Sequence, residues 1–207
     1  KFHFSPFNLS TFGGLASFPA QIAEPNRINN GPMLKLNGID IPRPTKYDDT
    51  VSTLEGWNSA IAWASSINKF NGKSRVQAKV LESILPLKLD FTQFPITGSQ
   101  IKINGVTLLQ GYARLSSASD VIDWVNDFAL STGVMARITP FNLEQIELYA
   151  TDGRNIVIDL MKQEKLAALF YNQIPSDQPS VYFGELELRS GAAFKIEDIA
   201  GVFVNPD

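Results

Sequence analysis

The sequence contains no cysteine and a single histidine, His3, among its 207 residues. Disulfide bonds and thiolate metal sites are therefore excluded, but the compartment stays open because a secreted protein need not contain disulfides. One histidine near the start of the chain provides neither a histidine-rich metal site nor a credible base for a Ser-His-Asp triad. We expect no cofactor and no metal ion, and we predict that the protein is not an enzyme.

Long hydrophobic runs and a strong charge of either sign are also missing. No apolar run approaches the roughly 18 residues that span a bilayer, and the net charge is only -3. A diffuse cationic surface for nucleic acid or anionic lipid is absent, so neither nucleic acid nor a membrane is an expected partner. Hydrophobic residues nevertheless make up 44% of the chain, which is enough to form the core of one large domain or two small ones.

No group of acidic residues marks a catalytic or metal site. Asp120, Asp123 and Asp127 follow helical spacing, which is typical of a solvated helix face. Asp48-Asp49 and Asp152-Gly153 are typical of loops and turns, and no acidic loop has EF-hand spacing. A carboxylate pair for glycoside hydrolysis stays open as an alternative, although the sequence singles out no such pair.

An internal repeat organises the residues that are present. Residues 34–41 and 101–108 both place alternating apolar residues around a central Asn-Gly pair. Asn-Gly tolerates the positive φ angles of a type I′ turn, so each segment predicts a tight β-hairpin. A helix and then a strand are expected after each hairpin. These elements recur at a constant offset in the numbering, 58 from Ile67 to Val125 (125 minus 67), and therefore form one repeating unit.

The helix of the first unit is predicted over 51–67 from apolar residues at steps of three and four. Its stripe includes Trp57, and Ser52 with Glu55 can form a capping box at its start. Trp63 lies about 120° around the helix from Trp57, at the edge of the buried face, where an aromatic ring can stack on a sugar. Trp63 is therefore the candidate glycan contact, with core packing as the alternative.

The helix of the second unit has Trp124 on its apolar stripe, with Ser117 and Asp120 placed for a capping box. Gly72 and Gly133 stand where the two helices are expected to end. A strand follows each helix, and the strands keep the offset of the helices. The helix and its strand are thus expected to pack together in both units.

The two copies differ in length at two places. The hairpins recur at a larger offset, 67 from Asn37 to Asn104 (104 minus 37), so the first unit is longer by nine (67 minus 58) between hairpin and helix. We expect this excess in a surface loop. The second unit continues with a predicted hairpin around Asp152-Gly153, whereas the first has no counterpart before the second unit begins. The first unit is therefore interpreted as truncated.

The predicted fold class is α+β, with two related β-hairpin–helix–strand units, each a small antiparallel sheet covered by one helix, and a terminal β-hairpin. Four segments are expected along the chain. They are an irregular phenylalanine-rich leading segment over 1–33, a truncated first unit over 34–100, a second unit over 101–160, and a trailing short helix and hairpin over 161–207.

Several of these segments resemble one known motif. Four segments of the second unit resemble the flagellin hook IN motif. They are Ile101-Lys-Ile-Asn-Gly-Val, a predicted helix that ends in Val125-Asn126, the segment Thr132-Gly133-Val134-Met135-Ala136, and residues 150–156. The first copy has the pair that names the motif as Ile67-Asn68, and 184–196 resembles the strand pair that often follows it. The motif occurs in the variable outer regions of bacterial flagellins and in some hook-associated and cap proteins. The resemblance covers about 34–80 and 101–196.

This resemblance implies a structural, secreted and surface-exposed outer domain of a bacterial flagellar filament or hook-filament junction protein, with functions in motility and adhesion. The sequence has none of the long heptad helices that build flagellar tubes. Contacts with other flagellar subunits are therefore expected through regions outside this sequence, and the isolated chain is expected to be monomeric. The alternative function is a polysaccharide-binding module of a cell-surface adhesin.

Overall fold

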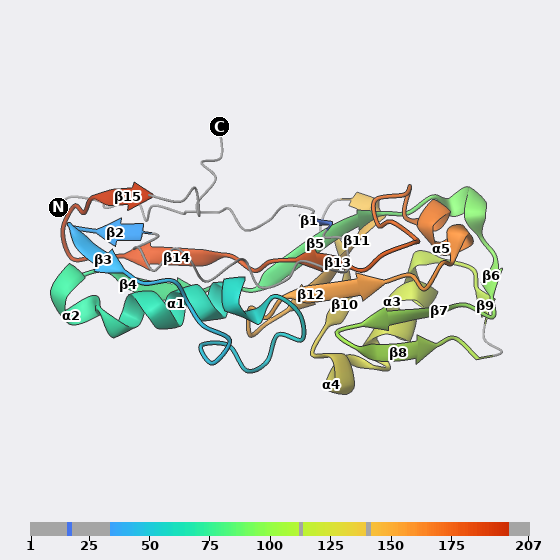
Figure 1. Cartoon of the computed structure of the whole chain (residues 1–207). Helices are drawn as coiled ribbons and strands as arrows, with labels where there is room; N and C mark the ends of the chain where they lie inside the picture. Colours follow the sequence, from blue (N-terminus) through green and yellow to red (C-terminus); the bar gives the residue numbers. More distant parts are fainter. Residues whose placement is uncertain (1–15, 18–33, 112–113, 140–141, 199–207) are drawn as a thin grey trace.

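The computed structural model describes residues 16–17, 34–111, 114–139 and 142–198. This part of the chain contains five α-helices and several small antiparallel sheets in an elongated body (Figure 1). The α+β class predicted from the sequence is confirmed. None of the helices within these residues is long and apolar enough to cross a membrane.

The two units consist of the same elements in the same order. Unit 1 contains β2 (Leu34–Leu36), β3 (Ile39–Ile41), α1 (Ala60–Lys69), α2 (Asn71–Ser74), β4 (Gln77–Val80), β14 (Leu186–Arg189) and β15 (Ile196–Asp198). Unit 2 contains β7 (Gln100–Ile103), β8 (Val106–Leu109), α3 (Ala118–Asn126), α4 (Ala129–Thr132), β10 (Met135–Thr139), β11 (Asn142–Ala150) and β12 (Ile156–Asp159). The starts of α1, α2 and β4 precede those of α3, α4 and β10 by the same offset of 58 (118 minus 60, 129 minus 71, 135 minus 77), as the repeat in the sequence predicts.

Unit 1 is complete, so its interpretation as truncated is wrong. Strand β14 pairs with β4 and β15 pairs with β2, just as β11 pairs with β10 and β12 with β7 in unit 2. Even the register is equivalent, because Glu187 faces Lys79 where Glu147 faces Arg137. Unit 2 is therefore inserted between β4 and β14. The sequence suggested a truncation because the last strands of unit 1 follow the whole of unit 2.

The strands on either side of Asp152-Gly153 do not form the predicted hairpin. Strand β11 pairs with β10 and with β5 (Ser83–Lys88), whereas β12 pairs with β7 and with β13 (Ser180–Tyr182). The turn therefore leads from one sheet into another. Strands β14 and β15, on either side of Ser190-Gly191, also belong to different sheets. An alternating pattern predicts a strand and its buried face but not the strand with which it pairs.

The turns of the two β-hairpins match their prediction. Asn37 and Gly38 have φ angles of 53° and 75°, and Asn104 and Gly105 have φ angles of 48° and 81°. Positive φ at both central residues defines a type I′ turn. Gly133, with a φ of 70°, ends α4 as expected.

Helix α1 begins later than the sequence predicted. Its N-cap is Ser59, whose hydroxyl accepts a hydrogen bond from the Ala62 N–H at 3.0 Å. The preceding residues form turns and the short 3₁₀ helix η1 (Gly56–Asn58), and Ser52 with Glu55 forms no capping box. The carboxylate of Asp49 accepts hydrogen bonds from the backbone N–H groups of Val51 and Ser52, which stabilise a turn in place of a helix. The predicted helix start was wrong for this reason.

The remaining predicted helix boundaries have mixed outcomes. Ser117 is the N-cap of α3, and its hydroxyl accepts a hydrogen bond from the Asp120 N–H at 3.2 Å. Gly72 lies inside α2, which ends instead at Arg75 in the left-handed region. The connector of unit 1 covers 42–59, between β3 and α1, whereas in unit 2 only 110–117 separates β8 from α3. The length excess therefore lies where it was predicted.

Each unit has its own hydrophobic core. In unit 1 the buried side chains come from β2, β3, α1, β4 and β14, with Trp63 and Ile67 at the centre. The unit 2 core contains Trp124 of α3. It also has side chains from three added elements, β6 (Ile96–Thr97), β9 (Arg114–Leu115) and α5 (Glu164–Leu169). Phe94, which follows the short 3₁₀ helix η2 (Phe91–Gln93), is partly buried against this core. Two separate cores indicate two folding units that meet at a junction.

Candidate functional site at the junction of the two units

The asparagine of the IN pair holds the helix to the following strand in both units. In unit 2 the Asn126 side-chain amide donates to the Ala136 carbonyl at 3.0 Å, and its oxygen accepts from the Ala136 N–H at 2.8 Å. Asn68 makes the same two bonds to Ala78, at 2.9 and 2.8 Å. The side chain thus replaces a neighbouring strand at this residue. Asn68 and Asn126 therefore stabilise the packing of a helix on the strand that follows it.

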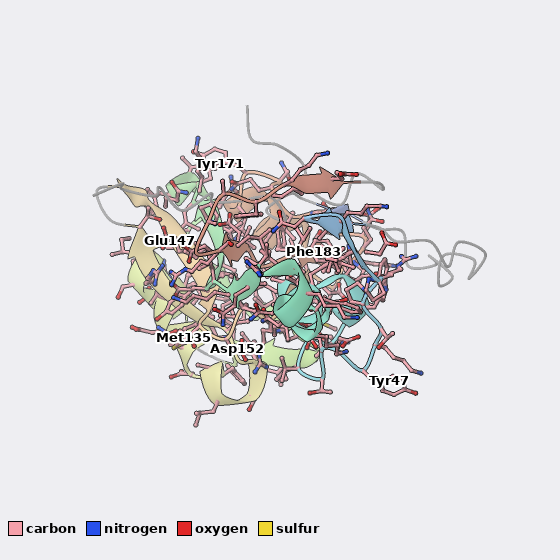
Figure 2. All side chains as sticks on the ribbon, turned by 90° about the vertical axis from the view of Figure 1, so that its left-hand side faces the viewer. Tyr47, Met135, Glu147, Asp152, Tyr171 and Phe183 are labelled. Atoms are coloured by element: carbon pink, nitrogen blue, oxygen red, sulfur yellow. The ribbon has the colours of Figure 1, made fainter. Side chains whose placement is uncertain are left out.

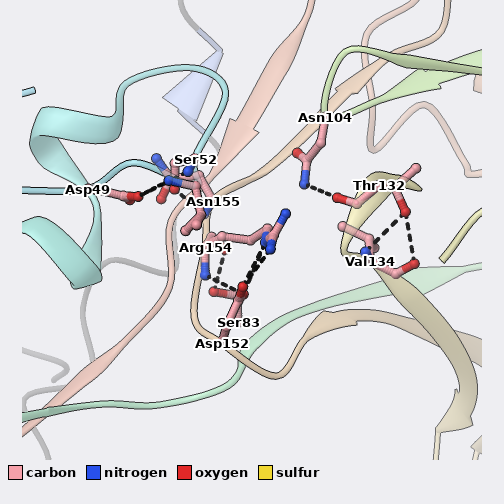
Figure 3. A network of polar contacts seen from close by, with 10 residues as sticks. Asp49, Ser52, Ser83, Asn104, Thr132, Val134, Asp152, Arg154 and Asn155 are labelled. Atoms are coloured by element: carbon pink, nitrogen blue, oxygen red, sulfur yellow. Dashed lines mark hydrogen bonds and ion pairs between the residues drawn. The ribbon is translucent and has the colours of Figure 1, made fainter. Parts of the chain in front are cut away.

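The turn asparagines make a second repeated contact. The Asn104 amide donates to the Thr132 carbonyl at 2.9 Å (Figure 3). Its oxygen accepts from the Val157 N–H at 2.8 Å. Asn37 makes equivalent bonds to Ser74 and Lys195, at 2.7 and 2.9 Å. Each asparagine therefore joins its hairpin turn to the end of a helix and to the last strand of the unit.

Asn155 connects unit 2 to unit 1. Its side chain is fully buried, and its backbone N–H donates to the Ser52 hydroxyl at 2.9 Å. Its side-chain amide donates to the carbonyls of Leu54 and Glu55 at 3.1 and 3.3 Å. All three partners lie on the long connector of unit 1 (Figure 3). The longer connector is thus more than the surface loop that the sequence predicted, because it contacts the neighbouring unit.

Close backbone packing tightens the junction on the unit 2 side. A Cβ atom on Gly153 would lie 2.0 Å from Cγ1 of Val80 and 2.6 Å from the Leu81 carbonyl, so the turn can approach unit 1 only with glycine at this position. The next carbonyl, of Arg154, accepts a hydrogen bond from the Ser83 hydroxyl at 2.8 Å. The turn is therefore fixed against the chain segment that enters unit 2.

Opposite charges from the two units face the junction. Arg154 forms an ion pair with Asp152 at 2.6 Å, and this contact, together with the more distant Asp49 of unit 1, raises the pKa of Arg154. Burial raises the pKa of Asp152, but hydrogen bonds from Arg154 lower it more. Asp49 also has a lowered pKa, because hydrogen bonds within its loop outweigh the effect of burial. Both carboxylates are therefore ionised at neutral pH and attract Arg154.

Trp63 cannot provide the glycan contact that the sequence suggested. Its side chain is 1% exposed, and its ring N–H donates to Oδ1 of Asn58 at 3.1 Å. Since α1 begins only at Ala60, Trp63 lies in the first turn and faces the sheet with Ile67. Trp57, expected in the core, is only partly buried and has the Arg43 guanidinium 4.1 Å from its ring centroid. Because the helix starts late, Trp63 is in the core, where Trp57 was predicted, and Trp57 is at the edge, where Trp63 was predicted.

The acidic residues of α3 are not brought together as a site. Asp123 and Asp127 are exposed, and the Asp120 carboxylate accepts a hydrogen bond from the Ser116 N–H at 2.7 Å. Across the described residues, no group of three His, Cys, Asp or Glu side chains is placed to hold a metal ion. The contacts of Asn155, Gly153 and Arg154 between the two units make the junction the candidate functional site.

Sequence reasoning did not identify Asn155, although one signal was available. The connector of unit 1 is longer than its counterpart in unit 2. In the structure this connector contacts Asn155. The extra length of one copy was therefore a candidate for the contact that joins the copies.

Replacing Asn155 by alanine should allow the two units to reorient while each stays folded. The substitution removes side-chain donors from two carbonyls in the junction, which costs about 1–3 kcal/mol where the groups stay buried. Residual dipolar couplings measured on the full chain should then require two alignment tensors instead of one. Asn126→Ala is the matched control, because it removes the same amide from a contact inside unit 2 and should keep a single tensor. A single tensor for Asn155→Ala would contradict the assigned function of the junction.

Comparisons of the chain with protein-family models and with curated proteins found no match.

Proposed function

We propose that this chain is a structural outer domain of a bacterial flagellar filament or hook-filament junction protein, and that it acts as a rigid spacer outside the cell. The observation that carries the proposal is the repeated asparagine contact at the position that names the IN motif, Asn68 in unit 1 and Asn126 in unit 2. In both units, the residues that resemble the motif form helix, turn and strand contacts of the same kind.

The path of the chain supports a projecting spacer. Leu34 and Asp198 are register partners on β2 and β15, so the segment from β2 to β15 begins and ends on neighbouring strands of unit 1. The preceding strand β1 (Ala16–Ser17) pairs with β13 in the sheet that contains β7, β8 and β12 of unit 2. Unit 2 is attached to unit 1 through neighbouring strands as well. Leu81 follows β4 and Glu185 precedes β14, and the Leu81 N–H donates to the Glu185 carbonyl at 2.8 Å, so the two connecting segments lie side by side. Each attachment uses two adjacent strands, and the result is a linear arrangement (Figure 1).

The contacts at the junction support a rigid arrangement of the two units. A spacer made of two units transmits force only if the units keep their relative orientation, and a single covalent connection would not ensure this. Here two connecting strands, the buried Asn155 and the Arg154 charge cluster join the units. Assembly into a filament would use other regions of a longer protein, which are also where we place the contacts with other flagellar subunits.

Antibodies raised against the full chain should label flagella of the source bacterium in immunogold electron microscopy. Labelling along the filament indicates a flagellin, and labelling only where hook and filament meet indicates a junction protein. Both results support the proposal, because the domain is expected on the outer surface in either case. Pre-adsorption of the antibodies with the purified chain is the control and should remove the label. Label confined to the cell body would contradict the proposal and favour the adhesin alternative.

A further inference from the structure

Aromatic residues follow α5 and precede β6, and these two elements lie at the end of unit 2 away from unit 1 (Figure 1). This distal aromatic patch consists of Phe91, Phe94 and Tyr171. Phe91 is 44% and Tyr171 is 57% exposed. Phe94 is partly buried against the core of unit 2, and its ring is stacked on that of Phe91 with centroids 6.1 Å apart. The Asp90 N–H donates to the Leu169 carbonyl at 2.8 Å, which places the two chain segments of the patch side by side.

The backbone holds the ring of Tyr171 in place at an energetic cost. Tyr171 and Asn172 have φ angles of 49° and 54°, a left-handed conformation that costs energy in residues other than glycine. Their N–H groups donate to Ala168 and Ala167 at 2.9 and 2.7 Å, so the strained turn is fixed to the end of α5. Strained residues that present a side chain to solvent occur preferentially at functional sites.

The other side of the patch is fixed as well. The Asp90 carboxylate accepts hydrogen bonds from the Thr92 N–H at 3.0 Å and from the Thr92 hydroxyl at 2.6 Å, which caps η2. The Gln173 side-chain amide donates to the Lys88 carbonyl at 3.1 Å and ties this segment to α5. A surface that is rigid before binding loses little conformational entropy when a ligand arrives.

We propose that the distal aromatic patch binds a neutral polysaccharide. Pyranose rings have apolar C–H faces that stack on aromatic rings, and their hydroxyl groups bond to side-chain amides and hydroxyls. Thr92, Gln93 and Asn172 have amide or hydroxyl side chains and adjoin the rings in the sequence. Thr92 and Gln93 also donate to the Asp90 carboxylate, at 2.6 and 3.1 Å. Charge does not favour an ionic ligand, because the neighbouring Lys88 and Asp90 have opposite signs. The inference goes beyond the flagellar function and does not depend on it.

Tyr47 is the matched control within the same chain. It is 79% exposed, but it lies on the connector of unit 1 and on the opposite side of the molecule from Tyr171 (Figure 2). The Lys46 ammonium lies 5.3 Å from the centroid of its ring. If exposure of any tyrosine were sufficient, substitutions of Tyr47 and Tyr171 would have the same effect.

The test is affinity electrophoresis of the full chain in gels that contain mannan, xylan or a soluble β-glucan, with anionic alginate as the charged comparison. We expect retardation by at least one neutral polymer. Tyr171→Asn should weaken it about tenfold, as for the loss of a central aromatic contact, whereas Tyr47→Asn should change it by less than about twofold. Asparagine tolerates the left-handed conformation, so Tyr171→Asn should stay folded; Phe91→Ser provides an independent second variant.

The following outcomes would overturn the proposal: no retardation by any neutral polymer, retardation by alginate alone, or equal losses for the Tyr47 and Tyr171 variants. Sedimentation of the full chain tests the rival occupant, a second copy. Self-association that Tyr171→Asn abolishes would show that the patch binds another copy, and a monomer at all concentrations is the expected result. The immunogold result is independent of these measurements, so failure of either proposal can be recognised separately.

Discussion

Ending the chain after Glu185 should unfold unit 1 and leave unit 2 folded. The deletion removes β14 and β15 and with them the core side chains of Leu186 and Leu188. It also removes Ile196, which packs against this core, and the Lys195 N–H, which donates to the Asn37 side chain. Complete burial of a large aliphatic side chain stabilises a fold by about 1.5–3 kcal/mol. Two such losses, with a smaller one from the partly buried Ile196, reach the lower end of the roughly 5–15 kcal/mol that typically stabilises a whole domain.

The indoles of Trp63 and Trp124 report on the two cores separately. In the ¹H–¹⁵N spectrum the Trp63 indole signal should move to its unfolded position, while the Trp124 signal should keep its native one. A chain that ends at Asp198 is the control, because it retains both strands and loses only 199–207. A native Trp63 signal after the deletion would mean that unit 1 folds without these strands, as its interpretation as truncated implied.

Trp124→Ala should destabilise unit 2 by about 3–5 kcal/mol, because it leaves a large cavity in a packed core. Trp124 is 7% exposed and packs among the buried side chains of unit 2. Asp123, its neighbour on α3, is exposed, and Asp123→Ala should change the free energy of unfolding by less than about 0.5 kcal/mol. Thermal and denaturant unfolding of both variants measures the difference. Small and equal shifts would show that Trp124 does not support the core.

The two units fill their cores with tryptophan from different helix positions. At the offset of 58, Trp124 corresponds to Ser66 and Trp63 corresponds to Val121. Ser66 is buried and its hydroxyl donates to the Pro42 carbonyl at 2.7 Å, so the connector of unit 1 lies where unit 2 has an indole. The two copies therefore keep the positions of their elements, although different side chains fill their cores. This is expected because a core tolerates exchanged side chains as long as its total volume is filled.

Features determined by local interactions could be predicted from the sequence. The Asn-Gly turns at 37–38 and 104–105, the N-cap at Ser117 and the helix end at Gly133 all depend on φ angles and hydrogen bonds between near neighbours. The constant offset between the copies is equally a property of the sequence. These features were sufficient to predict the α+β class and two related units.

The tertiary structure decided how the elements combine. Only long-range pairing shows that β14 and β15 complete unit 1, because an alternating pattern indicates a buried face and leaves the partner strand open. The start of α1 depended on competition between the Asp49 turn and the Ser59 cap, and that competition decided the burial of Trp63. The contact of Asn155 with the unit 1 connector joins positions that lie far apart in the sequence. Such contacts form only when both units are folded, so sequence periodicity contains no direct signal for them.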